Sequence, residues 1–386
     1  MNNEKGEMKW WQGGLIVILS VLIAGLFSAL LSSDFSSIEI FAPIEKKVDF
    51  NVSDIYNMIE EDRQGRELSE EVVVVSVDDL DREQLLTLID TIRQYEPKAI
   101  GLDIYFSIEK ADNKALINKI QNTPNMVSIS RIQKDSDNIH YQEENLSFFD
   151  EKITPPHKGY ANLDINHSWT VVRTFLPYVR SRSDNIIPSM ALELVRIAAP
   201  ERAEEAIRRG NTEEIIDFTH QEIEVISAVR LKNPAVAQGL KGKIVLLGVI
   251  EDTKDIYLTP LREPTAGVLV HAYATLTILN GQYIQTRATW KNWAIAVCIC
   301  LILVSLLLYA NENEGLKYGL NLAVRILMFI FMFMLVYIGC AQFANSHIYA
   351  DYTPAITMLV FGTLAFDLVY AGYGLCRQLK LRRKNK

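Results

Sequence analysis

The chain has 386 residues, of which 49% are apolar and 22% are charged, and its formal net charge is −8. This acidic balance argues against nucleic acid as a partner, because phosphate recognition depends on clustered lysine and arginine. The apolar residues gather in runs near the two ends, and a charged stretch of ordinary globular composition lies between them. The sequence therefore predicts a membrane protein with a globular central block.

Four apolar runs come close to the roughly 20 residues that a helix needs to cross a bilayer. The first follows a short charged start, residues 1–9, and so has the layout of a signal peptide as well as that of an anchor. We favour an uncleaved anchor, because the apolar core is long and no clean cleavage site follows it. The expected spans are residues 10–31, 293–310, 320–342 and 354–376.

The charges beside these spans predict the orientation of the chain. The tail at residues 377–386 carries six basic residues and no acid, and basic residues next to a span stay on the cytoplasmic side. We therefore expect a multi-pass membrane protein with both termini cytoplasmic and residues 32–288 outside. The same basic residues also suit contact with anionic membrane lipids, which explains them without a protein partner.

The central block begins with a leader, residues 33–70, in which only a short helix near residues 54–61 is expected. Five valines in the six positions 72–77 predict a strand that is buried on both faces, as in a parallel sheet. Leucine and isoleucine at helical spacing follow, then Pro97, and then a second apolar run at residues 99–106. This order is typical of a β-α-β unit.

Further along, a third strand is expected at residues 125–132, a polar surface excursion at 135–154, and a hairpin formed by 159–166 and 171–179. Helices are predicted at 187–199, with Pro188 in the first turn, at 200–210, and at 267–281. A last buried strand is expected at 241–250. The predicted fold is an α/β domain with a central, largely parallel sheet, together with four transmembrane helices, one N-terminal and three C-terminal.

Acidic residues follow several of these strands. Asp78 and Asp79 come after the first strand, Asp103 lies late in the second, and Asp255 is one of three acids after the last. Ligands of open α/β sheets bind outside the carboxyl ends of the parallel strands, and converging carboxylates there would suit a divalent cation or an amine. The alternative is that these acids cap helices and accept hydrogen bonds from loop amides.

Catalytic signatures are absent from the sequence. It contains no G-x-G-x-x-G, Walker A, H-E-x-x-H or G-x-S-x-G motif, and its six histidines have no metal-ligand spacing. We therefore expect no enzymatic activity and no cofactor, and leave a metal site open. His271, on the last helix of the block, is read either as a packing residue or as a ligand.

Two charges interrupt the last two spans, Arg325 and Asp367. Counted from the cytoplasmic ends of their spans they lie at similar depths, so we expect them to form a pair. Such a pair would act either as a strut between helices or as a joint that couples the membrane segment to the external block.

The order of one span, an α/β block and three spans, together with the segments "VVVVSVDD", "KAIGLDIYFS", "GKIVLLGVIEDTKDIYLTPL" and "GVLVHAYATLTILNG", resembles the CHASE2 family of extracytoplasmic sensory domains. The resemblance covers about residues 72–284 and the flanking spans. It implies family site positions at the strand-end acids Asp78 and Asp103, at Arg173 before an apolar strand, at Asp255 before the "TP" turn, and at His271.

The chain also departs from the family pattern. The usual Trp-Pro-rich turn after the first strand is replaced by "DDLDREQLL", and the glycine usual before Arg173 is missing. The spans of the family usually lead into a cytoplasmic output module, and only about ten residues follow the last span here. We therefore expect a receptor-like sensor that binds an unidentified extracytoplasmic ligand, forms a homodimer, and acts through a separate cytoplasmic or membrane signalling protein. The alternative is a structural subunit of an envelope assembly that has no ligand.

Overall fold

The computed structural model describes residues 8–32, 52–62, 66–105, 113–136, 139–144, 156–163, 171–210, 213–313, 315 and 317–384. The chain divides into two compact units. Residues 57–284 form one, which we call the α/β unit. Residues 1–56 and 285–386 form the other, which we call the membrane unit.

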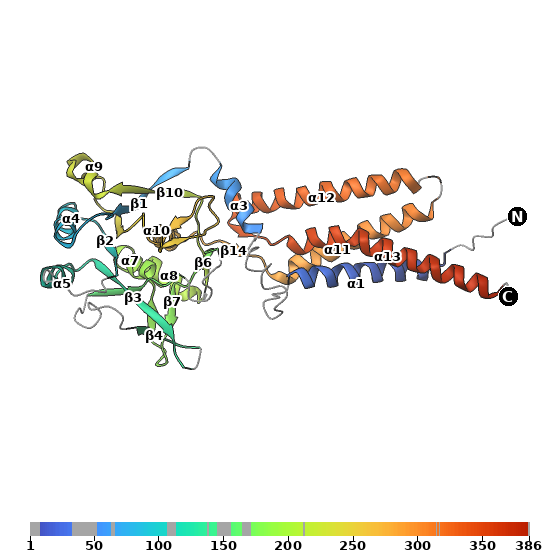
Figure 1. The fold of residues 1–386 in the computed structure, drawn as a ribbon, viewed down its shortest axis with the longest axis horizontal. Coiled ribbons are helices and arrows are strands. Elements are labelled where there is room, and N and C mark those ends of the chain that lie inside the picture. Colours follow the sequence, from blue (N-terminus) through green and yellow to red (C-terminus); the bar gives the residue numbers. More distant parts are fainter. Residues whose placement is uncertain are drawn as a thin grey trace. The chain divides into compact units, whose positions relative to one another are not determined.

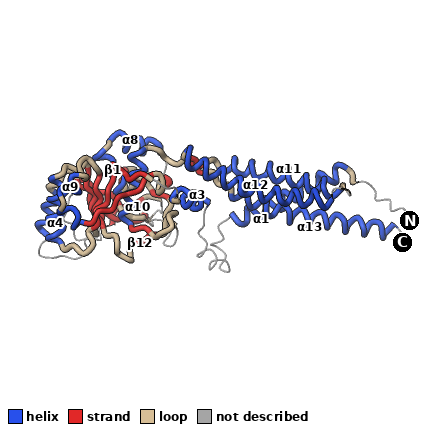
Figure 2. The backbone as a smooth tube through the Cα atoms, turned by 90° about the horizontal axis from the view of Figure 1, so that it is seen from above, coloured by secondary structure: helices blue, strands red, loops and turns tan. Residues whose placement is uncertain are grey.

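A mostly parallel sheet lies at the centre of the α/β unit (Figures 1 and 2). Its strand order is β10-β1-β11-β2-β3-β4, and β5 also pairs with β3. The pairing of β3 with β4 is antiparallel, and the other pairings in this sheet are parallel. The strands are β1 (Glu67–Ser76), β2 (Ala99–Asp103), β3 (Met126–Lys134), β4 (Tyr141–Glu144), β5 (His157–Tyr160), β10 (Gln221–Ser227) and β11 (Ile244–Gly248).

The valine run of β1 shows why the sheet is buried on both faces. Val72 and Val74 pack into one hydrophobic cluster, whereas Val73 and Val75 pack into the cluster on the opposite face. Helices α7 (Met190–Ala198), α8 (Pro200–Arg209) and α10 (Gly267–Asn280) supply the first cluster. Helices α4 (Arg82–Gln94), α5 (Asn113–Gln121) and α9 (Pro234–Gln238) supply the second. The expected α/β fold with a central, largely parallel sheet is thereby confirmed.

The ends of these helices follow from their sequences. Asp81 caps α4 through the backbone amide of Gln84, and the Gln84 side chain accepts a hydrogen bond from the Asp81 amide. This reciprocal capping satisfies two donors that the first turn leaves open. Helix α8 begins at Pro200 and ends at Gly210, whose φ of 68° continues the chain in the left-handed region that glycine tolerates.

The membrane unit contains four helices that are long and apolar enough to cross a membrane, as expected. They are α1 (Trp10–Ser32), α11 (Thr289–Glu312), α12 (Lys317–Ser346) and α13 (Thr353–Lys384). Helix α1 packs along α13, with Ala24 fully buried and the Ser28 hydroxyl 2.5 Å from that of Thr357. Small and hydroxyl-bearing residues are typical of close packing between membrane helices, so α1 is an integral part of this bundle.

A short parallel pair of strands, β14 (Gln285–Thr286) and β15 (Ile348–Tyr349), joins the ends of these helices. Arg287 donates hydrogen bonds to Gln342 of α12 and to the Tyr352 hydroxyl, 2.9 Å in each case. Tyr56 of α3 (Val52–Glu61) is buried here, and its hydroxyl donates to the Ala350 carbonyl at 3.1 Å. Most of the predicted leader lies outside the described residues.

Two sequence expectations were wrong. The described parts of the expected hairpin, 159–163 and 171–179, do not pair with each other: β5 joins β3 in parallel, whereas β6 (Thr174–Phe175) pairs with β9 (Glu214–Ile215). Local spacing suggested a hairpin because a partner distant in sequence leaves no local signal. Helix α7 begins at Met190 rather than 187, because Pro188 belongs to β8 (Ile186–Pro188), which pairs with β7 (Tyr178–Arg180), and Ser189 caps the helix.

Two glycines that pack against α7, Gly159 of β5 and Gly101 of β2, give a matched test of this packing. A Cβ added at Gly159 would lie 2.6 Å from the Met190 Cα, whereas one at Gly101 would lie 2.5 Å from the flexible Met190 Cε. The backbone of α7 cannot move away from an added methyl group, whereas the end of a methionine side chain can. Gly159→Ala should therefore lower the free energy of unfolding by about 1–3 kcal/mol, and Gly101→Ala should lower it by less. Thermal melts of the purified full chain would measure this, and equal losses would contradict the packing.

Candidate functional site

The carboxyl ends of β1, β11 and β2 lie side by side, so the acids that follow them meet at one edge of the sheet. Asp103, the last residue of β2, stands opposite Gly248 of β11, and Gly248 stands opposite Ser76 of β1. A Cβ at Gly248 would lie 2.6 Å from the Val268 Cβ. The absence of that Cβ lets the first turn of α10 lie directly on the strand ends.

Asp255 is positioned by the start of the same helix. It precedes the hairpin of β12 (Ile256–Tyr257) and β13 (Thr265–Ala266), and its carbonyl accepts the Gly267 amide at 2.9 Å. Its carboxylate lies against the Gly267 Cα so closely that an added Cβ would be 2.5 Å from Oδ2. A carboxylate at this place is stabilised by the positive end of the α10 dipole.

Burial and mutual repulsion shift the acidity of these groups. Burial raises the pKa of Asp103 to about 7. Burial and the nearby Asp103 carboxylate raise the pKa of Asp255 to about 6, against the opposing effects of His271 and of a hydrogen bond from Tyr257. Both carboxyl groups therefore change charge close to neutral pH, whereas an ordinary aspartate titrates near 4.

His271 is the third member of this group and is only 5% exposed. Burial lowers its pKa to about 4, although the Asp255 charge and a hydrogen bond with the Ala161 backbone both favour the protonated ring. A bond that favours protonation is one in which the ring N–H donates to a carbonyl. The His271 imidazole is therefore neutral at physiological pH. We call Asp103, Asp255 and His271 the strand-end site.

Asp78 lies at the same edge but has a different environment. Its Oδ1 accepts the amides of Ile250 and Glu251, each at 3.0 Å, and its Oδ2 accepts the Ser76 hydroxyl. Burial acts to raise the pKa of Asp78, but these hydrogen bonds outweigh it and lower the pKa below the ordinary value. Asp78 therefore holds the loop after β11, which is the alternative that the sequence left open for the strand-end acids.

Asp79 and Arg173, which were also predicted for this site, have backbone roles in the structure. Asp79 is exposed and turns the chain with a φ of 63°. The backbone carbonyl of Arg173 accepts a hydrogen bond from the Ile216 amide at 3.0 Å. Among the predicted ligand-binding residues, Asp103, Asp255 and His271 are close enough for their charges to interact.

The predicted transmembrane pair forms in the membrane unit. Arg325 of α12 donates to both carboxylate oxygens of Asp367 on α13, at 3.0 and 2.9 Å. Both bonds come from the same guanidinium nitrogen, Nη2, so this is not the stronger fork in which two nitrogens each bond one carboxylate oxygen. Whether the pair is a strut or a moving joint stays a prediction.

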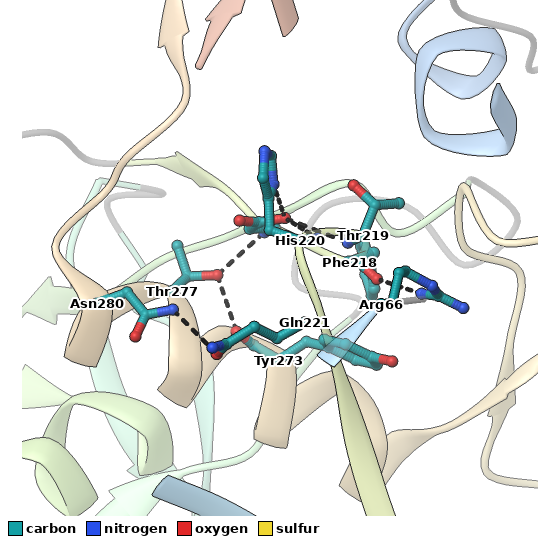
Figure 3. Close-up of polar contacts among 9 residues, drawn as sticks. Arg66, Phe218, Thr219, His220, Gln221, Tyr273, Thr277 and Asn280 are labelled. Atoms are coloured by element: carbon teal, nitrogen blue, oxygen red, sulfur yellow. Dashed lines mark hydrogen bonds and ion pairs between the residues drawn. The ribbon is translucent and has the colours of Figure 1, made fainter. Parts of the chain in front are cut away.

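A second polar cluster, which the sequence reading missed, precedes the edge strand β10 (Figure 3). The Asp217 carboxylate accepts the amides of Thr219 and His220 and the Nδ1 of His220, the last at 2.8 Å. Burial acts to raise the pKa of Asp217, but His220 and these amides lower it overall. Thr277 of α10 accepts the Asp217 amide at 3.0 Å, so the cluster fixes this turn to α10. The sequence signal that could have predicted this cluster is an aspartate followed by two turn residues, because aspartate accepts hydrogen bonds from the amides that follow it.

The strand-end site does not present a preformed trio of metal ligands. Among the described residues, the ligating atoms of Asp103, Asp255 and His271 are not all within 4.8 Å of one another. A direct metal ion needs ligands about 2.0–2.6 Å from its centre, so binding one here would require the side chains to move.

The fold defines a membrane protein whose α/β domain lies between its first and second apolar spans. A family model for the CHASE2 domain matches residues 18–308, and the chain belongs to this family of sensory domains, as its motifs indicated. No curated protein and no solved structure matches the chain.

The strand-end site makes the stability of the protein depend on pH. Asp103 and Asp255 hold their protons more tightly in the folded state, so folding takes up protons and the free energy of unfolding falls as pH rises from about 4 to 7. His271, whose pKa is lowered, has the opposite effect between about 4 and 6.5, so the carboxyl effect stands alone above that range. Asp103→Asn should therefore raise the melting temperature by several degrees at pH 8 and by roughly half as much at pH 5.5, where only part of this cost has built up.

The matched control is Asp79→Asn, which changes an exposed acid of the neighbouring strand end. It should give the same small difference from the native chain at both pH values. Melting curves of the full chain at pH 5.5 and 8 test this directly. A gain from Asp103→Asn that does not depend on pH would show that the Asp103 charge costs nothing in the folded state.

Proposed function

We propose that this protein is a membrane-bound sensor whose α/β unit binds a cationic ligand at the strand-end site and reports it to a separate protein. The observation that carries the proposal is the pair of carboxyl groups, Asp103 and Asp255. Burial raises the pKa of Asp103 to about 7, and burial together with the nearby Asp103 charge raises that of Asp255 to about 6. Perturbed groups of this kind gather at functional sites more often than elsewhere. Membership of a sensory family supports the same reading.

The electrostatics favour a cation over an anion or a neutral molecule. A cation beside Asp103 and Asp255 would offset their repulsion and favour their ionised forms. Binding would thus release protons and would be tighter at pH 8 than at pH 5.5. A primary amine or diamine, which offers several N–H donors, suits two separated carboxylates, and a hydrated divalent cation is the second candidate.

The direction of signalling follows from the charges beside the spans. The basic tail after α13 supports cytoplasmic termini and an extracytoplasmic α/β unit in a bacterial inner membrane. With no catalytic motif in the sequence, the proposed role is non-enzymatic, and a cytoplasmic or membrane partner would carry the output. Ligand binding can shift such a partner only if it favours one of two conformations of the chain.

Thermal shift measurements on the purified full chain test the proposed ligand class. Putrescine, magnesium and calcium are added separately at pH 8, because the ionised carboxylates bind a cation most tightly there. A binding probe should raise the melting temperature in proportion to the logarithm of its concentration. The rise should vanish in Asp103→Asn and persist in Asp79→Asn, whose charge lies outside the strand-end site.

Two results would count against the sensor proposal. A shift that survives Asp103→Asn would place the ligand elsewhere on the chain. A melt that no cation moves, combined with purification in fixed stoichiometry with another envelope protein, would favour the structural role instead.

The proposed orientation has its own test by labelling of single cysteines in intact cells. Ser183→Cys, on the exposed turn between β7 and β8, should react with a membrane-impermeant maleimide, in a chain where Cys298 and Cys376 are replaced by serine. Arg383→Cys in the basic tail should react only after the membrane is permeabilised. The reverse pattern would contradict the orientation that the basic tail predicts.

A further inference from the structure

The ion pair of the membrane unit lies on the outer surface of its helices. The Arg325 side chain is 41% exposed and that of Asp367 is 50% exposed, although each belongs to a helix apolar enough to span a membrane. Arg325 lies roughly 12 Å along α12 from its first residue, Lys317, since each helical residue adds about 1.5 Å. The hydrocarbon core is about 30 Å thick, and both residues belong to helices apolar enough to span it, so we expect this face of the pair to meet lipid.

Hydrocarbon cannot satisfy the hydrogen bonds that this exposed pair leaves open. A guanidinium has five N–H donors, and both bonds to Asp367 come from one nitrogen of Arg325, Nη2. Arg325 makes no other hydrogen bond among the described residues. Charged groups in a membrane characteristically face other protein groups or water, because lipid tails offer neither donor nor acceptor. Something polar should therefore cover this face.

We propose that a second copy of this chain covers it, through a two-fold interface in which Arg325 also meets the partner's Asp367. The argument is charge complementarity. The face carries one positive and one negative group side by side, so a two-fold rotation brings unlike charges together across the interface. Four charges then form a neutral, hydrogen-bonded network that no lipid tail could supply.

The surface around the pair suits a close approach of helices. On α13, Leu364 and Leu368 are 51% and 59% exposed, and nothing lies within 4 Å of the place where a Gly372 Cβ would stand. An exposed small residue lets helix backbones approach, and apolar neighbours exclude water from the charged network. The interface is therefore a ring of apolar side chains with the Arg325–Asp367 pairs inside it.

Disulfide cross-linking of the full chain in native membranes tests the interface. In a chain with Cys298→Ser and Cys376→Ser, Leu368→Cys should form a covalent dimer on mild oxidation. The matched control is Leu22→Cys on α1, where Leu22 is 62% exposed but far from the pair in the sequence; it should stay monomeric. Adding Asp367→Asn to Leu368→Cys should slow dimer formation at least 10-fold.

A cross-linking rate at Leu368→Cys no greater than at Leu22→Cys would overturn the proposal, as would a rate that Asp367→Asn does not change. A different protein captured at this position would overturn it too. If Asp367→Asn lowers the melting temperature, its slower cross-linking could reflect loss of folding. The double exchange Arg325→Asp with Asp367→Arg then tests the interface, because it keeps unlike charges in contact within and between copies. That exchange should restore the native rate, and a folded exchange variant that stays monomeric would contradict the interface.

Discussion

The close packing of α10 on the ends of β1 and β11 is the constraint on which the candidate site depends. Gly248 removes the side chain that would hold the helix away from the sheet, and Gly267 leaves room for the Asp255 carboxylate at the start of the helix. Because the helix lies so close, His271 and Asp103 are withdrawn from water. Their shifted pKa values therefore follow from a packing distance that two missing side chains allow.

Asp78 and Asp103 show that residue type and position at a sheet edge do not fix a role. Both are aspartates at the carboxyl ends of strands that flank β11. Asp78 receives two backbone amides and a hydroxyl, so its charge is solvated by the protein itself. Burial makes the charge of Asp103 costly and raises its pKa to about 7, and the Asp103 charge in turn helps to raise the pKa of Asp255. Only in the second arrangement would an added cation favour loss of the retained proton.

The membrane unit treats polar groups in two ways. The Ser28 and Thr357 hydroxyls lie between α1 and α13, where each satisfies the other and the backbone nearby. Arg325 and Asp367 satisfy each other only in part and remain on the surface. The hydroxyl groups have their hydrogen bonds within one chain. The ion pair leaves hydrogen-bond donors open, which the proposed second copy would satisfy.

The sequence by itself determined the four spans, the strands β1, β2, β3 and β11, and the helices α4, α8 and α10. Apolar run length, β-branched content, and proline and glycine at helix ends are local signals, and these elements carry them strongly. Asp103 lies at the end of β2 and His271 lies on α10, as the apolar strand and helix patterns predicted.

The tertiary structure alone decided which strands are neighbours and what surrounds each acid. The parallel partner of β5 and the edge strand β10 went unpredicted, because pairing between distant segments leaves no periodic mark in either one. The separation of Asp78 and Asp79 from the strand-end site was equally hidden. A pKa depends on burial and on neighbouring charges, and both are set by where α10 and the loop after β11 come to rest on the sheet.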